Sequence, residues 1–140
     1  MSKQQLFLGF MFLLIGFSCK DRYEIFDEKL PNGSIKLNLH VQKQVTDNLL
    51  LEITDLNDSR CPVGAVCSEA GMVKVDIRVL SNVGTGIATL FFSEVPNTVQ
   101  TADTVAGYRI EVIEVTPMPY LNKPIETDSL YSVYVLANKI

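Results

Sequence analysis

The chain has 140 residues, of which 47% are hydrophobic, and a formal net charge of −4 at pH 7. This acidic balance makes nucleic acid a poor partner. The one histidine and two cysteines that are expected to be oxidised supply too few ligands for a zinc site. Without a leader, about 120 residues remain, which is the size of a single domain.

Residues 1–18 differ from the rest of the chain. Lys3 is their only charged side chain, and residues 6–17 form an unbroken apolar run. This run is too short to cross a hydrocarbon core, which needs about 20 residues of helix. The layout is that of an export signal, so residues 1–18 are predicted to be a cleaved signal peptide.

The residues around Cys19 indicate how the mature N-terminus is modified. Ser18 lies directly before Cys19, and Gly16 is also small. The arrangement resembles the lipobox of bacterial lipoproteins, although Gly16 and Phe17 stand where that motif usually has Leu and a small residue. The resemblance implies that Cys19 is lipidated and anchors the protein in the cell envelope, at the outer membrane and facing the periplasm or the surface. The alternative is a plain signal peptide with an incidental cysteine.

Residues 19–30 are dense in charge and are predicted to be a lipidated tether. Lys20 and Asp21 resemble surface-export signals of some Gram-negative lipoproteins. A solvated linker is the alternative interpretation.

The cysteine count supports lipidation independently. Three cysteines are awkward in an exported protein, because its thiols oxidise in pairs. If Cys19 carries lipid, Cys61 and Cys67 remain, and a disulfide between them is the simplest use. Closing a loop of this size would stabilise the fold by about 2.4 kcal/mol.

Residues 31–140 are predicted to form one all-β domain, because their hydrophobic residues alternate with a period of two. Turn residues separate the segments. The pattern predicts a single antiparallel β-sandwich, immunoglobulin-like in general shape, with a small β-barrel as the alternative. The pattern predicts at least six strands and at most eight. The six clear ones lie at 35–41, 49–53, 73–79, 87–92, 108–115 and 131–136.

Segment 58–71, DSRCPVGAVCSEAG, leads directly into the strongest strand pattern. It resembles a motif of small, mostly uncharacterised bacterial lipoproteins and secreted proteins, and the likeness extends to segment 107–117. Those proteins commonly have Trp just before the Ala-Gly pair, where this chain has Glu69, so the loop should be less buried here. The resemblance implies an exported β domain and supplies no activity.

Two interpretations of this segment stay open. Pro62 presets φ and Gly64 relieves the turn, so a disulfide would pre-organise Arg60, Pro62, Val63 and Gly64 as a binding or inhibitor loop. An inhibitor of this kind requires an exposed Arg60. The alternative is a staple between strands, with Arg60 paired to Asp58 or a neighbouring carboxylate.

Other candidate chemistry is weak. Asp55, Asn57 and Ser59 have the spacing that opens a calcium loop, but the sixth and twelfth positions of an EF-hand, Gly and Glu, are missing. His40, predicted at a polar strand position, has no nucleophile motif near it. No catalytic, cofactor-binding or metal-binding residue is therefore predicted. Glu111 and Glu114 differ in strand parity and are expected on opposite faces.

Surface chemistry gives two more candidates. Thr104 and Ser129 each follow Asp and precede an apolar residue, a pattern that resembles O-glycosylation sites of some envelope proteins; local Asx or Ser/Thr turns are the alternative. Four tyrosines could form an aromatic platform, although tyrosines at a core edge are the expected arrangement: Tyr108, Tyr120, Tyr131 and Tyr134.

Taken together, these features predict a non-enzymatic, lipid-anchored envelope protein that acts as a binding or structural module. Its expected partners are the membrane, through the lipid, and an envelope protein or glycan that the sequence does not identify. No cofactor is predicted. A protease inhibitor using the loop from Cys61 to Cys67 and an envelope hydrolase are the alternatives.

Overall fold

The structure is a computed structural model that describes residues 33–123, 125 and 130–140. The predicted leader and tether, including Cys19, lie outside these residues, as does Ser129. The described part contains eight strands, and the six predicted strands are all among them. The strands are β1 (Ile35–Asn38), β2 (Gln42–Thr46), β3 (Leu49–Asp58), β4 (Val73–Ser81), β5 (Gly84–Phe92), β6 (Ala102–Val105), β7 (Tyr108–Thr116) and β8 (Ser132–Lys139).

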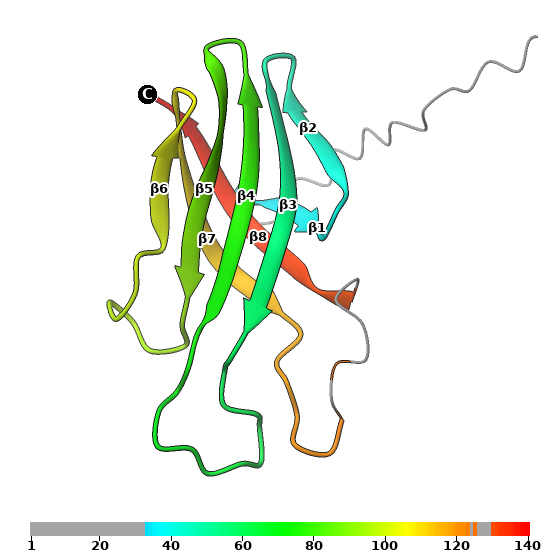
Figure 1. The fold of residues 1–140 in the computed structure, drawn as a ribbon, viewed down its shortest axis with the longest axis vertical. Helices are drawn as coiled ribbons and strands as arrows, with labels where there is room; N and C mark the ends of the chain where they lie inside the picture. Colours follow the sequence, from blue (N-terminus) through cyan, green and yellow to red (C-terminus); the bar gives the residue numbers. More distant parts are fainter. Residues whose placement is uncertain (1–32, 124, 126–129) are drawn as a thin grey trace, which may run out of the picture.

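The strands form two antiparallel four-stranded sheets that pack face to face, which confirms the predicted β-sandwich (Figure 1). One sheet has the order β1-β8-β7-β6 and the other has the order β2-β3-β4-β5. Each sheet is therefore built largely from strands that follow one another in the chain, and β1 closes the first sheet beside β8. This order differs from the immunoglobulin arrangement, in which each sheet mixes early and late strands.

The core lies between the sheets and is made by the inward positions of each strand. In β4, Val73, Val75, Ile77 and Val79 are fully buried, and the residues between them face solvent. Burying each such side chain contributes about 1.5–3 kcal/mol relative to leaving it exposed. The period of two in the sequence is thus the pattern that separates core from water.

The two ends of the sandwich differ (Figure 1). At one end, tight turns at 47–48, 82–83 and 106–107 join neighbouring strands. Ala106 and Gly107 both have positive φ, 50° and 78°, as a type I′ hairpin requires. At the other end lie the long connections β3–β4, β5–β6 and β7–β8. We call these the hairpin end and the loop end.

The predicted strand at 35–41 is too long. β1 ends at Asn38, and the chain turns at His40, whose φ is 58° and whose N–H donates to the Ile53 carbonyl at 2.9 Å. Val41 is exposed rather than buried. The reason is topological: β1 and β2 belong to different sheets, so the chain has to bend between them.

A β-bulge in β3 decides which residues face the core. The antiparallel register with β4 shifts between Ile53 and Asp55. Before the shift, Leu51 and Ile53 are buried; after it, Leu56 packs against the core and the Asp58 side chain is 6% exposed. A bulge inserts one residue and so reverses the alternation beyond it. Asp58 therefore points into the interior at the loop end.

A second bulge corrects the expectation for Glu111 and Glu114. The register between β7 and β8 shifts between Val112 and Glu114, and both Val112 and Val115 are buried. Because Ile113 is the extra residue, Glu111 and Glu114 fall on the same outward face of the sheet. The prediction from odd and even positions assumed that the strand alternates regularly, and the bulge in β7 breaks this alternation.

Candidate functional site

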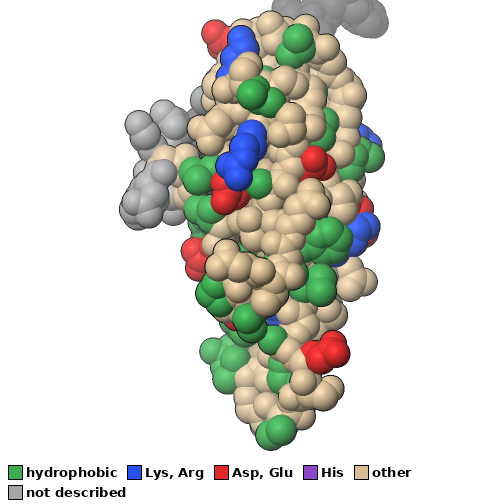
Figure 2. All heavy atoms as spheres, turned by 90° about the vertical axis from the view of Figure 1, so that its left-hand side faces the viewer, with side chains coloured by type: hydrophobic (Ala, Val, Ile, Leu, Met, Phe, Trp, Pro, Cys, Tyr) green, Lys and Arg blue, Asp and Glu red, His purple; other side chains and the backbone are tan. Residues whose placement is uncertain are grey.

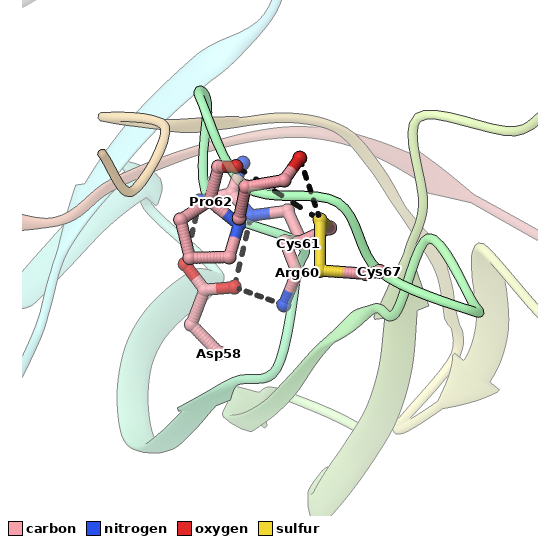
Figure 3. The surroundings of a disulfide bond; sticks show 6 residues. Asp58, Arg60, Cys61, Pro62 and Cys67 are labelled. Carbon is pink, nitrogen blue, oxygen red and sulfur yellow. Dashed lines mark hydrogen bonds and ion pairs between the residues drawn. A yellow bond between two sulfur atoms is a disulfide. The ribbon is translucent and has the colours of Figure 1, made fainter. Parts of the chain in front are cut away.

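Asp58 and Arg60 form a buried ion pair at the loop end. The Arg60 side chain is 1% exposed. Its Nε donates to Asp58 Oδ1 at 2.9 Å and its Nη2 donates to Asp58 Oδ2 at 2.7 Å, so the guanidinium and carboxylate meet as a two-pronged pair (Figure 3). The Arg60 backbone N–H also donates to Oδ1, at 3.0 Å. Paired contacts of this type are the strongest that Arg and Asp make.

The remaining Arg60 donors reach the end of β7 and the segment that follows it. Nη1 donates to the Val115 carbonyl at 2.9 Å, and Nη2 donates to the Pro117 carbonyl at 2.7 Å. Nη1 also lies 3.7 Å from a carboxylate oxygen of Glu94 in the β5–β6 connection. One side chain therefore joins all three long connections of the loop end.

Asp58 has a third partner, the Tyr131 hydroxyl, which donates to Oδ2 at 2.9 Å. Burial by itself raises the pKa of Asp58, but the hydrogen bonds from Arg60 and Tyr131 outweigh burial and lower that pKa below its ordinary value. Asp58 is thus held as a carboxylate.

We expect acid to remove the contribution of Asp58 to stability. Its folded-state pKa lies below that of the unfolded chain, so the contribution is complete above the ordinary Asp value of about 3.9 and declines as the pH falls through the folded pKa. In urea unfolding at a series of pH values, the stability difference between wild type and Asp58→Asn should shrink below about pH 4. A difference that stays constant across this range would contradict the assignment.

The base of the β3–β4 loop is closed by backbone hydrogen bonds. Ser59 N–H donates to the Met72 carbonyl at 2.8 Å, and Cys61 N–H donates to the Ala70 carbonyl at 2.8 Å. Gly71 makes this closure possible, because its φ is +71° and a Cβ there would lie 2.0 Å from the Ser59 carbonyl oxygen. The two arms of the loop can approach so closely only if residue 71 has no side chain.

The tip of the same loop is closed by the disulfide between Cys61 and Cys67, as predicted (Figure 3). Inside this ring, Val63 pairs with the β7–β8 connection: its N–H donates to the Pro119 carbonyl at 2.8 Å, and its carbonyl accepts from Leu121 N–H at 3.1 Å. The tip is therefore attached to a segment far away in the sequence.

Apolar side chains are exposed around this junction. Val66 is fully exposed at 104%, and the exposed fractions of Val63, Tyr120 and Leu121 are 46%, 52% and 57%. A depression of about 460 Å³ is lined by Val63, Tyr120 and Leu121 together with Asn122 and Lys123. Figure 2 shows hydrophobic side chains reaching the surface at this lower end of the molecule. We call Val63, Val66, Tyr120 and Leu121 the apolar tip.

The structure distinguishes the two interpretations of segment 58–71. Arg60 pairs with Asp58, as the staple interpretation predicts. The inhibitor alternative requires the Arg60 side chain to be exposed, and this expectation is wrong, because the side chain is buried. Pro62, Val63 and Gly64 do lie in the disulfide-closed tip. Sequence reasoning missed the Arg60 partners on the β7–β8 side, because they lie more than 50 residues away.

The other candidate residues lie elsewhere. Thr104 is exposed on β6, and its N–H donates to Asp103 Oδ1 at 2.7 Å, the kind of local contact expected as the alternative to glycosylation. Tyr108 and Tyr131 are 6% exposed and belong to the core, so the tyrosines form no common platform. Within the described residues, no three His, Cys, Asp or Glu side chains gather as metal ligands.

No helix among the described residues is long and apolar enough to cross a membrane. The chain matches no protein-family model, and no curated protein or solved structure is significantly similar to it. Its function therefore has to be argued from the loop end itself.

Proposed function

We propose that this chain is a lipid-anchored envelope protein, held through Cys19, whose β-sandwich binds another envelope protein through the apolar tip. The observation that carries the proposal is the exposure of Val63, Val66, Tyr120 and Leu121 where the disulfide-closed loop pairs with the β7–β8 connection. Scattered exposed apolar residues are common, whereas a group of them at one place indicates an interaction site.

The position of the tip supports binding. Long connections supported by a rigid sandwich carry recognition in many β folds, because the scaffold tolerates changes there. A disulfide and backbone pairing also restrict the tip before any partner arrives. Less conformational entropy is then lost on association.

A protein fits this surface better than a glycan does. Three of the four side chains are aliphatic, and Tyr120 is the only aromatic ring among them. Aliphatic groups gain most from burial against another apolar surface. The hydrolase alternative names no residue, and no observation on the described residues favours it. Glycosylation of Thr104 stays a prediction.

The proposal can be tested in the native host with a photoreactive phenylalanine analogue placed at Val66. Irradiation should produce a discrete covalent adduct with one envelope protein, because the Val66 side chain is fully exposed at the tip. Adding Leu121→Asp should reduce the adduct by about tenfold or more, the effect of removing a central interface residue. Intact mass before irradiation should show a mature N-terminus at Cys19 with acyl groups attached.

The matched control is the same analogue at Val83, which is 68% exposed at the hairpin end. It should give no such adduct. Similar adducts from both positions, or adducts that persist unchanged with Leu121→Asp, would rule out recognition through the tip. A mass without lipid would rule out the anchor.

A further inference from the structure

The disulfide and the Arg60 contacts hold different parts of the β3–β4 loop. The base is closed by the hydrogen bonds from Ser59 to Met72 and from Cys61 to Ala70, and Arg60 ties it to the β7–β8 connection. None of these contacts involves a residue between Cys61 and Cys67. The disulfide adds a second ring beyond the base, with a sequence separation of 6.

The contacts within that ring are few. Ala65 N–H donates to the Pro62 carbonyl at 3.0 Å, and Val63 makes its two backbone hydrogen bonds with Pro119 and Leu121. Gly64 has a φ of +91°, which glycine also adopts freely in an open chain. Residues 62–66 bury no large side chain, so the covalent bond is their main constraint.

The disulfide can be reached by a reagent. Cys67 is exposed and Cys61 is half-buried, and the next two residues, Ser68 and Glu69, are exposed as well. Exposed disulfides are the ones that thiols reduce readily, whereas structural ones are protected by burial. Cys67 is therefore the sulfur open to attack.

We propose that the Cys61–Cys67 disulfide is a redox modification site, opened by a dithiol reductant of the thiol–disulfide oxidoreductase class. Opening releases residues 62–66 from the β7–β8 connection and leaves the sandwich folded, because the base of the loop is held by other contacts. The conformational change stands by itself; its effect on partner binding rests on the proposed function.

The exchange has two steps. In the first, a thiolate of the reductant attacks Cys67 Sγ, the Cys61–Cys67 bond breaks, and Cys61 leaves as a thiolate that takes up a proton. In the second, the other thiol of the reductant, once deprotonated, attacks the mixed disulfide and releases Cys67, which takes up the other proton. Two electrons pass to the protein, and the reductant becomes a disulfide.

The experiment is amide hydrogen exchange on the full-length protein, without any partner, before and after treatment with dithiothreitol. The amides of Val63 and Leu121 should exchange up to about 50-fold faster after reduction, the factor that corresponds to losing the entropy of ring closure. The amides of Ser59 and Cys61 and those of β4 should keep their protection, because the disulfide does not hold them. Cys61→Ser/Cys67→Ser should reproduce the reduced pattern without dithiothreitol.

A second measurement tests access. Alkylation should show that dithiothreitol reduces the disulfide at similar rates in buffer and in urea, because no unfolding is needed. Reduction only on unfolding, unchanged exchange of Val63 and Leu121, or loss of protection in β4 would each overturn the proposal. The absence of a binding partner would not affect these readouts, so failure of the proposed function can be distinguished.

Discussion

Replacing Arg60 by Met should lower the free energy of unfolding by about 3–5 kcal/mol, because it leaves the Asp58 carboxylate buried without its cation. It also removes the donors to the Val115 and Pro117 carbonyls. Domains of this size are stable by about 5–15 kcal/mol, so the loss would remove a large part of the total. Equilibrium unfolding in urea measures it directly.

The control is Arg109→Met. Arg109 also pairs with a carboxylate, that of Glu111, but its side chain is 50% exposed. Exposed pairs contribute at most about 1 kcal/mol, so this variant should be close to wild type. Asp58→Leu/Arg60→Met should be less destabilised than the sum of its single variants, because no unpaired charge remains. Equal losses from Arg60→Met and Arg109→Met would contradict the role given to the buried pair.

Replacing Gly71 by Ala should have the second large effect, a loss of about 2–4 kcal/mol. About 1–2 kcal/mol comes from placing an L residue at positive φ. The rest comes from the hydrogen bonds between Ser59 and Met72, which break when the new Cβ displaces the Ser59 carbonyl. Thermal or urea unfolding measures the change.

Gly64→Ala separates the two causes. Gly64 also has positive φ, +91°, but a Cβ there would meet only Leu121 Cβ, at an ordinary 3.9 Å. This variant should lose only the conformational part, about 1–2 kcal/mol. If both variants lost the same stability, the close approach at Gly71 would not be what closes the base of the loop.

The sequence by itself determined the class of the fold. Alternation such as that of Val73, Val75, Ile77 and Val79 depends only on which side of a strand each residue occupies, and it can be read locally. The disulfide was also predictable, because Cys61 and Cys67 lie close in the sequence and are the pair that remains if Cys19 is assigned to lipid. The edge strands β2 and β6 were harder to place, because short edge strands have few inward apolar residues.

Only the tertiary structure decided the site. The apolar alternation of Leu49, Leu51 and Ile53 stops in the sequence after Ile53, and the bulge that follows is what turns Asp58 inward to meet Arg60. The Pro117 carbonyl and Tyr131 lie 57 and 73 residues from their partners. Such contacts arise from packing between elements far apart in the chain, so a local sequence pattern cannot predict them. The pairing of Arg60 with Asp58 could therefore be proposed from the sequence, but its burial and its contacts with the Val115 and Pro117 carbonyls could not.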